Sequence, residues 1–330
     1  MTAAGVLSKR LRRKGLLLAA ALVLTACSRS TTKRIAVVPK ANSHEFWVAV
    51  HAGAAAAGQK FGVEILWNGP ALETEYDRQM QIVDSMLSQH VDGLAVAAAE
   101  RNALNRSLDR AAQLGIPVTV FDSGVDSAKY MTFVATNNYQ AGQLAAREMG
   151  TLADGKGKIA MVMNAPGSAS TMDRERGFEE TIKSEFPQIE IVVRQFSMAA
   201  RSKAIEAAEN MLTAHPDLAG IFASSEPGSA GAALALKSRG LAGKLKLVGF
   251  DASEDLIADL RGGTVSALVV QDPFQMGFQA VKTLVDKLHG STPPKQVDLP
   301  ARLVHKADLD KREIHELLYP DVKKYSGSGG

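Results

Sequence analysis

The chain has 330 residues, of which 46% are hydrophobic, and a formal net charge of +3 at pH 7. Five of its basic side chains lie in residues 1–26, which hold no acidic side chain, so the remainder carries a net charge of −2. A body this close to neutrality lacks the basic surface that nucleic-acid binding requires, and we expect no nucleic-acid partner. The single cysteine excludes an internal disulfide.

The N-terminus has the pattern of a secretory signal peptide. A cluster of basic residues precedes a stretch of Leu, Ala and Val, 16–26, which is too short to cross a bilayer. The small residue Ala26 stands directly before Cys27, as in the bacterial lipobox, whose cysteine is lipidated after cleavage. We therefore expect a lipoprotein signal peptide over 1–26, a lipid anchor on Cys27 and a tether over 27–33. The alternative is an incidental cysteine behind an ordinary signal peptide.

Beyond the tether, short apolar runs alternate with segments of helical period. Such runs are typical of buried parallel strands. The expected strands are 35–38, 63–66, 93–96, 117–121, 158–163, 189–193, 219–223, 245–250 and 265–270. About 300 residues of this pattern exceed one hydrophobic core. The sequence therefore predicts an α/β fold with two doubly wound parallel-sheet lobes, followed by a flexible Gly- and Ser-rich tail over 325–330.

The residues that follow these strands are strongly polar and aromatic. In open parallel sheets, ligands bind beyond the carboxyl ends of the strands. The segments at that position are 42–47, 97–100, 122–123, 164–174, 224–226, 250–251 and 271–272. We expect the binding site to be built from them.

At these positions the chain resembles the ribose- and galactose-type periplasmic sugar-binding proteins of ABC importers. These share their fold with the effector domain of LacI-type repressors. The resemblance covers about 34–306, and its order and spacing are more specific than any single motif. The segments that carry it are Phe46-Trp47, Gly115-Ile116-Pro117-Val118, Phe121-Asp122, Arg174-x-x-Gly177-Phe178, Val248-Gly249-Phe250-Asp251 and Val270-Gln271-Asp272-Pro273.

The resemblance implies the periplasmic binding protein type I fold. In this fold, two Rossmann-like lobes joined by a three-stranded hinge close around the ligand. The crossings are then expected near 135–138, 271–272 and 301–302. The expected N-terminal lobe comprises 33–136 plus 272–301, and the expected C-terminal lobe comprises 137–271 plus 302–324.

The resemblance and the chemistry of a polyol together give the expected ligand-binding residues. Carboxylates accept hydrogen bonds from hydroxyls, Arg donates, Gln does both, and aromatic faces cover C–H patches. The expected set is Phe46, Trp47, Asp122, Arg174, Asp251, Gln271, Ser225, His44, Ser123, Lys40, Glu226 and Phe250. Two questions stay open: which of Phe46 and Trp47 stacks on the ligand, and whether Lys40, His44 and Glu226 contact it.

Several positions depart from the ribose-type pattern. Ala97 stands where that type has Asn, and Ser123 stands where it has Arg. A stacking Phe of the second lobe falls at about Met198-Ala199, and an Asn becomes Ser225. Smaller side chains enlarge the expected cavity, so we expect a sugar or polyol bulkier than ribose.

A second comparison gives an alternative ligand class. The segments 38–40, 68–70 and 195–196 resemble the branch that includes autoinducer-2 and rhamnose receptors. In the autoinducer-2 type, however, the acid of the second lobe aligns with Arg174.

A second alternative concerns the role of the protein. It could be a receptor for a sensor or chemoreceptor, which the sequence alone does not separate from transport.

No catalytic set accompanies the expected site. The run Gly155-Lys156-Gly157-Lys158 lacks P-loop spacing, and His44-Glu45 lacks the second His of a zinc motif, because position 48 is Val. The sequence therefore predicts a monomeric binding protein without metal, cofactor or enzyme activity. It would capture a monosaccharide or related polyol and deliver it to an ABC permease and its ATPase. The expected location is periplasmic or at the cell surface, as a membrane-anchored lipoprotein.

Overall fold

The computed structural model describes residues 32–42 and 44–325, to which the structural account is confined. The chain divides into a first unit, Met1–Thr32, and a compact second unit, Lys33–Gly330. Cys27 and the expected signal peptide lie outside the described residues. Within the described ranges, no helix has the length and apolar character needed to cross a membrane.

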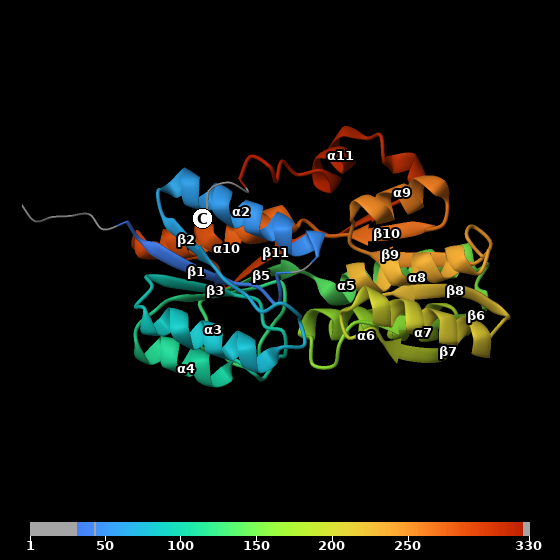
Figure 1. The fold of residues 1–330 in the computed structure, drawn as a ribbon, viewed down its shortest axis with the longest axis horizontal. Coiled ribbons are helices and arrows are strands. Elements are labelled where there is room, and N and C mark those ends of the chain that lie inside the picture. Colours follow the sequence, from blue (N-terminus) through green and yellow to red (C-terminus); the bar gives the residue numbers. More distant parts are fainter. Residues whose placement is uncertain (1–31, 43, 326–330) are drawn as a thin grey trace, which may run out of the picture. The chain divides into compact units, whose positions relative to one another are not determined.

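The second unit contains two β-sheets (Figure 1). The first is formed by five strands from the N-terminal part of the chain and one strand from near its C-terminus. Its strands are β1 (Arg34–Val38), β2 (Glu64–Trp67), β3 (Gly93–Val96), β4 (Val118–Phe121), β5 (Thr132–Thr136) and β11 (Gln296–Leu299). They pair in the order β11-β5-β4-β3-β1-β2, and each neighbouring pair is parallel. The helices that pack on this sheet are α2 (Glu45–Phe61), α3 (Tyr76–Ser88), α4 (Asn105–Gln113) and α10 (Pro273–Leu288). We call this sheet with its helices the N-lobe.

The second sheet repeats the same topology. Its strands are β6 (Lys156–Met163), β7 (Gln188–Phe196), β8 (Leu218–Ala223), β9 (Lys246–Phe250), β10 (Ala267–Val270) and β12 (Arg302–Val304). They pair in the order β12-β10-β9-β8-β6-β7, and only β12 runs antiparallel to its neighbour. The helices of this part are α5 (Asn138–Leu152), α6 (Ala169–Glu185), α7 (Arg201–Ala214), α8 (Glu226–Ser238), α9 (Glu254–Gly262), η1 (Lys306–Asp308) and α11 (Arg312–Leu318). We call this part the C-lobe, and with it the predicted doubly wound α/β fold is confirmed.

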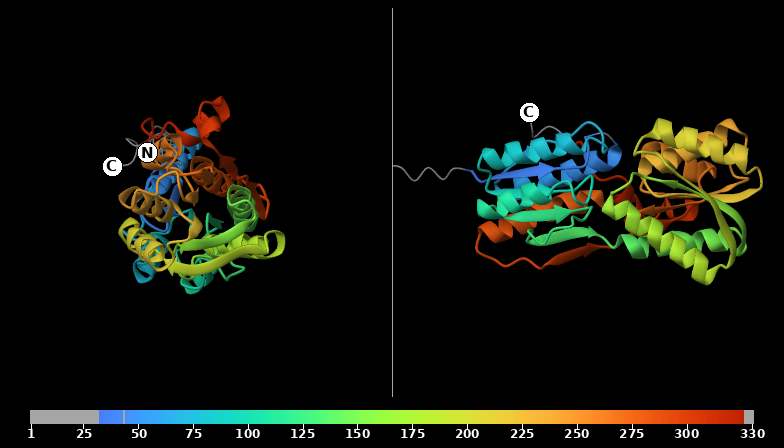
Figure 2. Two further views of the ribbon diagram at one scale, coloured as in Figure 1. Left: turned by 90° about the vertical axis from the view of Figure 1, so that its right-hand side faces the viewer. Right: turned by 90° about the horizontal axis from the view of Figure 1, so that it is seen from below.

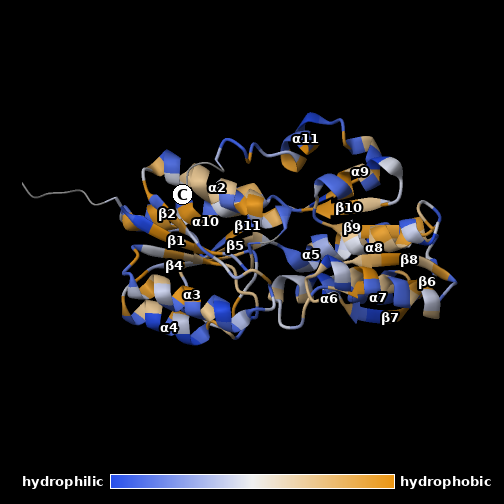
Figure 3. Cartoon of the chain, in the orientation of Figure 1, coloured by the Kyte–Doolittle hydropathy of each residue, from blue (hydrophilic) through white to orange (hydrophobic). Residues whose placement is uncertain are grey.

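Each sheet has an apolar core on both of its faces. In β1, Ile35 and Val37 pack with α2 and α10, whereas Ala36 and Val38 pack with α3 and α4. In the C-lobe, α5 and α6 cover one face, and α7, α8 and α9 cover the other. Figure 3 shows the apolar residues gathered between strands and helices. Strands buried on both faces explain the continuous apolar runs in the sequence.

The chain passes between the two sheets at three places (Figure 2). The first lies between β5 and α5, the second between β10 and α10, and the third between β11 and β12. Each connection is only one or two residues long. Short connections of this kind bring the carboxyl ends of the strands in both lobes toward one another.

The end of the chain differs from the expectation of a flexible tail that begins at residue 325. Beyond α11, which packs on the C-lobe core through Ile314, the chain runs on to Tyr325. The ring of Tyr325 lies 5.9 Å from that of Phe274 in α10 of the N-lobe. The C-terminal segment therefore contacts both lobes, while 326–330 lie outside the described residues.

Candidate functional site

A narrow cavity of about 30 Å³ lies at the carboxyl ends of the strands of both sheets. It is much smaller than the roughly 300–1,000 Å³ usual for small-molecule sites, because side chains of the two lobes meet across it. The residues that line it are Lys40, His44, Phe46, Trp47, Glu73, Asp122, Asn164, Ser170, Thr171, Arg174, Ser225, Glu226, Pro227, Asp251 and Gln271. We call it the interlobe cavity.

Ten of the twelve expected ligand-binding residues line this cavity, and two do not. Ser123 lies behind the lining, where its Oγ accepts a hydrogen bond of 3.2 Å from the backbone N–H of Ser170. Phe250 is fully buried and packs beneath Arg174. Contact of any of these residues with a ligand stays a prediction.

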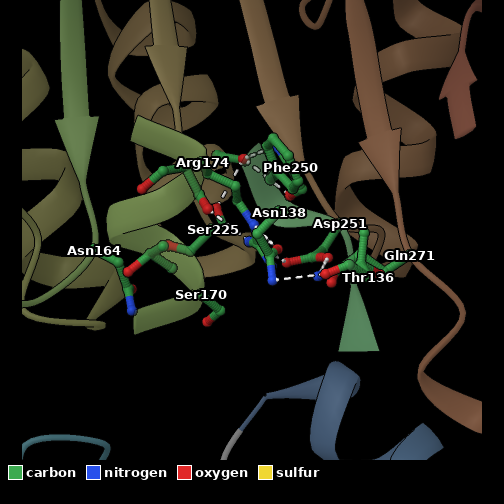
Figure 4. Close-up of polar contacts among 12 residues, drawn as sticks. Thr136, Asn138, Asn164, Ser170, Arg174, Ser225, Phe250, Asp251 and Gln271 are labelled. Carbon is green, nitrogen blue, oxygen red and sulfur yellow. Dashed lines mark hydrogen bonds and ion pairs between the residues drawn. The ribbon is translucent and has the colours of Figure 1, made fainter. Parts of the chain in front are cut away.

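Arg174 forms the wall of the cavity on the C-lobe side (Figure 4). Its Nε donates to Asn138 Oδ1 at 2.9 Å, and its Nη1 donates to the backbone carbonyl of Ser224 at 2.8 Å. The guanidinium carbon lies 4.2 Å from the ring centre of Phe250, and Nη1 lies 3.8 Å from Asp251 Oδ2. All four partners belong to the C-lobe, so this lobe alone orients the guanidinium.

Two glycines hold the helix of Arg174 close to its neighbour α5. A Cβ atom on Gly142 of α5 would lie only 2.0 Å from the carbonyl oxygen of Arg174. A Cβ atom on Gly177 of α6 would lie only 2.2 Å from the carbonyl oxygen of Tyr139. Because larger residues would push the two helices apart, this close approach fixes the position of Arg174 relative to the sheet.

Glu175 lies behind Arg174, buried from solvent. Its Oε1 accepts hydrogen bonds from the backbone N–H of Asn164 at 3.0 Å and from Ser224 Oγ at 2.7 Å. Burial raises the pKa of Glu175 to about 7, although these hydrogen bonds and the charge of Arg174 act in the opposite direction. This carboxyl therefore titrates near neutral pH.

Asp122 and Asp251 occupy corresponding positions in the two lobes. They follow β4 and β9 directly, and both have positive φ angles, 56° and 65°. Their backbone N–H groups donate to Val134 of β5 and Val269 of β10 at 2.9 and 2.8 Å. A non-glycine residue in this left-handed conformation is uncommon, and such residues cluster at functional sites. The turn aims each carboxylate into the interlobe cavity.

Asp251 is held by the crossing between β10 and α10. Gln271 Nε2 donates to Asp251 Oδ1 at 2.7 Å. Burial raises the pKa of Asp251, opposed by the charge of Arg174 and the hydrogen bond from Gln271. The carboxylate can still accept hydrogen bonds from a ligand through Oδ2, which faces Arg174.

Lys40 forms the wall of the cavity on the N-lobe side. It follows β1, is 3% exposed, and places Nζ 3.0 Å from Asp122 Oδ2. The same Nζ donates across the cavity to Ser170 Oγ at 2.9 Å and to Ser168 Oγ at 3.2 Å. The ammonium group therefore joins the two lobes directly.

Glu73 also connects the two lobes. Its Oε1 accepts a hydrogen bond of 3.0 Å from Trp47 Nε1, and its Oε2 accepts one of 3.3 Å from Asn164 Nδ2. The rings of Trp47 and Phe46 meet edge to face, with centroids 5.0 Å apart. Glu73, which lies in the loop after β2, is not among the residues that the sequence predicts for the site. Asn164 fell within an expected polar segment, because it follows β6 directly.

His44 and Glu226 meet at another side of the cavity. His44 Nδ1 lies 3.7 Å from Glu226 Oε2, and Arg201 Nη2 donates to Glu226 Oε1 at 3.2 Å. Both residues line the cavity, and their contact with a ligand stays a prediction. Within the described ranges, no group of three or more His, Cys, Asp or Glu side chains could hold a metal ion.

This arrangement of two lobes, three connections and a polar cavity between them defines a two-lobed solute-binding protein. A family model described as a periplasmic binding protein domain matches residues 35–292, and the chain belongs to this family. The predicted family and fold are thereby confirmed.

Relatives with known roles agree with this assignment. The ribose import binding protein of Bacillus subtilis (strain 168) is 28% identical over 264 residues, which cover 79% of this chain and 83% of that protein. An ABC transporter solute-binding protein from Agrobacterium vitis with bound D-fucose is 34% identical, with a TM-score of 0.85 over 87% of this chain and all of that chain. A carbohydrate transporter solute-binding protein from Agrobacterium radiobacter in complex with D-arabinose is 28% identical, with a TM-score of 0.86 over 88% of this chain and all of that chain. These proteins are binding components of transport systems and not enzymes.

Proposed function

We propose that this periplasmic protein captures a monosaccharide or related polyol in the interlobe cavity and delivers it to the permease and ATPase of an ABC importer. One observation is the main support for this class of ligand. Asn164 Oδ1, Ser225 Oγ and Gln271 Oε1 line the cavity, and none has a hydrogen-bond partner among the residues that the structure describes. Each can accept a hydrogen bond, and leaving it unsatisfied costs about 1–3 kcal/mol. The hydroxyl protons of a polyol would satisfy Asn164 Oδ1 and Ser225 Oγ, whereas Gln271 also lines a second pocket beside the hinge.

The two pairs of opposite charges support the same ligand class. Lys40 with Asp122 on one wall, and Arg174 with Asp251 on the other, each offer a donor beside an acceptor. A sugar hydroxyl needs both, because its oxygen accepts and its proton donates. The ribose type has an arginine at the position of Ser123. In this chain Lys40 supplies a cation beside Asp122 instead.

The charge of the lining argues against anionic ligands. Besides His44, the cavity is lined by two basic side chains and four acidic ones, which are Lys40, Arg174, Glu73, Asp122, Glu226 and Asp251. A carboxylate or phosphate would enter an environment of net negative charge. The D-fucose and D-arabinose bound by the two structural neighbours support a neutral monosaccharide.

We extend the proposal to anchoring and motion. Cys27 would carry the lipid that holds the protein at a membrane, as the pattern of residues 16–27 indicates. The lobes would rotate about the three crossings, so that binding energy from both walls favours the closed arrangement. A Cys27→Ser variant that remains in the membrane fraction would refute the anchor without affecting the proposal on sugar binding.

Isothermal titration with a panel of sugars tests the ligand class. D-Arabinose, D-fucose, D-ribose and L-rhamnose represent neutral ligands, and D-galacturonate and D-ribose 5-phosphate represent anionic ones. We expect at least one neutral sugar to bind and neither anion to bind. Heat from the anions alone, or from no sugar, would contradict the proposal.

Fluorescence tests whether the bound sugar lies in the interlobe cavity. The chain has two tryptophans, of which Trp47 lines the cavity and Trp67 stacks on His51 outside it. We expect Trp47→Phe to abolish the fluorescence change on sugar binding and Trp67→Phe to retain it. Loss of uptake of the same sugar after deletion of the gene would test delivery to the importer.

A further inference from the structure

A second pocket of about 560 Å³, which we call the hinge pocket, lies beside the crossing from β10 to α10. Its walls come from the first turn of α2 in the N-lobe, the start of α9 in the C-lobe, and the crossing itself. The C-terminal segment 317–323 forms its remaining wall. The pocket touches the interlobe cavity only through Phe46, Asp251 and Gln271, which line both.

The lining of the hinge pocket is mainly apolar. Val48 and Tyr319 are among the most exposed large hydrophobic side chains of the described chain, at 47% and 45%. Both face this pocket, together with Ile257, Leu317 and Leu318. A concave apolar surface with a few polar groups is the usual form of a small-molecule site. Its volume also suits a small organic molecule.

The polar groups of the hinge pocket are mostly acceptors. Its charged lining residues are Glu45, Asp251, Glu254, Asp321 and the single cation Lys323. Glu45 lies at the boundary between the lobes, where its Oε2 accepts a hydrogen bond of 3.0 Å from the backbone N–H of Glu254. Burial raises the pKa of Glu45 and the nearby acids raise it further, whereas the hydrogen bond from the backbone of Glu254 lowers it. A positive charge placed beside this carboxyl would be attracted to it and to the acidic residues around it.

Gln271 gives an independent indication of a ligand. Its side chain is 1% exposed and lines the hinge pocket, and its Oε1 lacks a hydrogen-bond partner among the described residues. A buried acceptor of this kind requires a donor. The apolar lining, the negative rim and the unsatisfied acceptor together specify the chemistry of an occupant.

We propose that the hinge pocket is a second binding site, which takes a small apolar molecule that carries a protonated amine. The apolar body packs on Val48, Ile257 and Tyr319, and the ammonium group lies against Glu45 and its acidic neighbours. Because the walls come from both lobes, the pocket has this shape only when the lobes are closed. Amine binding and sugar binding therefore favour each other by thermodynamic linkage.

Benzylamine is the probe that tests this site, by isothermal titration of the purified protein. Benzyl alcohol has nearly the same shape without the charge, and benzoate has the opposite charge. We expect benzylamine to bind about tenfold more tightly than benzyl alcohol, as one charged hydrogen bond predicts, and benzoate to bind least. We also expect benzylamine to bind more tightly once the protein is saturated with sugar.

Val48→Lys places a cation at the mouth of the pocket, on an exposed helix position that sugar recognition does not use. We expect this variant to lose benzylamine binding and to keep sugar binding. Leu114→Lys is the matched control, because Leu114 is similarly exposed, at 44%, but lies outside the pocket. Equal binding of benzylamine to both variants, equal affinity for benzyl alcohol, or no binding at millimolar concentration would overturn the proposal, whether or not a sugar binds.

Discussion

The two walls of the interlobe cavity hold their cations in different ways. On the C-lobe wall, Arg174 makes its hydrogen bonds within its own lobe and stacks on the buried ring of Phe250. On the N-lobe wall, Lys40 pairs with its own lobe but also donates to Ser168 and Ser170 of the other lobe. One wall is complete within a single lobe, whereas the other is completed by contact between the lobes.

This difference suggests an order of events in binding. A guanidinium that its own lobe already orients loses little freedom when a sugar arrives, so the C-lobe wall is pre-organised. The ammonium of Lys40 acquires two of its acceptors only when the lobes meet. We therefore infer that the sugar docks first on the C-lobe, and that closure then brings Lys40 into place.

Removal of Arg174 is expected to have the largest effect. Arg174→Met leaves Asp251 without its cation. It also leaves Asn138 Oδ1 and the backbone carbonyl oxygen of Ser224 without their hydrogen-bond donor. Breaking a buried pair by removing one partner costs about 3–5 kcal/mol of stability. The lost hydrogen bond from the charged guanidinium to the sugar is worth about 1.5–3 kcal/mol, so we expect affinity to fall by roughly 10- to 150-fold. Isothermal titration with the bound sugar measures the loss, and urea denaturation shows how much of it falls on stability.

Arg176→Met is the control for Arg174. Arg176 lies on the same helix, is exposed, and pairs with Asp173 at the surface at 2.9 Å. We expect this substitution to change affinity and stability by less than about 1 kcal/mol. If Arg174→Met weakened sugar binding no more than the control does, the C-lobe wall would not be the docking surface.

The buried carboxyl of Glu175, behind Arg174, is expected to make the stability of the protein depend on pH. Its folded-state pKa of about 7 lies above the ordinary value of 4.5. The folded protein therefore binds a proton more tightly than the unfolded chain does. The free energy of unfolding is fully retained below pH 4.5 and falls as the pH rises through 7, by about 3 kcal/mol. We expect Glu175→Gln, which keeps an acceptor for Asn164 and Ser224, to abolish this decline in urea denaturation between pH 5 and pH 8.

Glu179→Gln provides the comparison for that experiment. Glu179 lies one turn further along α6 and pairs with Arg194 at the surface of the C-lobe at 2.7 Å. This variant should keep the decline of stability with pH. The same slope in Glu175→Gln and in the unmodified protein would assign the titration to another group.

Much of the site could be predicted from the sequence, because strand ends are visible in it. Asp122, Asp251 and Gln271 each follow an apolar run directly, and parallel strands bring such positions to one edge. Phe250 shows the limit of this reasoning. It is the last residue of β9, and side chains alternate along a strand, so its ring enters the core while Asp251 reaches the cavity.

Other features were not predicted from the sequence. Glu73 lies in an irregular loop, and only the fold brings it to Trp47 and Asn164. The strands β5, β11 and β12 were not expected either. The strand β11 alternates between exposed and half-buried residues at a sheet edge, and β12 has three residues, so neither forms a continuous apolar run. The contact of Tyr325 with Phe274 likewise depends on tertiary structure.

The smallest effect is expected from removing the hydrogen bonds that Lys40 makes to the C-lobe. The double variant Ser168→Ala with Ser170→Ala removes both C-lobe acceptors of Lys40, while Lys40 keeps its pair with Asp122. No charge is left unpaired, so we expect little change in stability. Sugar affinity should fall by about 1–2 kcal/mol, or roughly tenfold, for two lost hydrogen bonds. The loss should come from faster dissociation, measured by stopped-flow fluorescence of Trp47, because docking on the C-lobe precedes closure.

Ser184→Ala makes the same substitution further along α6, where the hydroxyl bonds only to the backbone of its own helix. It should leave both rate constants of sugar binding unchanged. If the double variant slowed association instead, Lys40 would act before closure, and the two walls would take part in the same step. If it dissociated no faster than Ser184→Ala, the contacts from Lys40 to the C-lobe would not stabilise the closed arrangement. Closure would then depend on the sugar and on the other hydrogen bonds between the lobes, which include those of Glu73, Ser123 and Glu45.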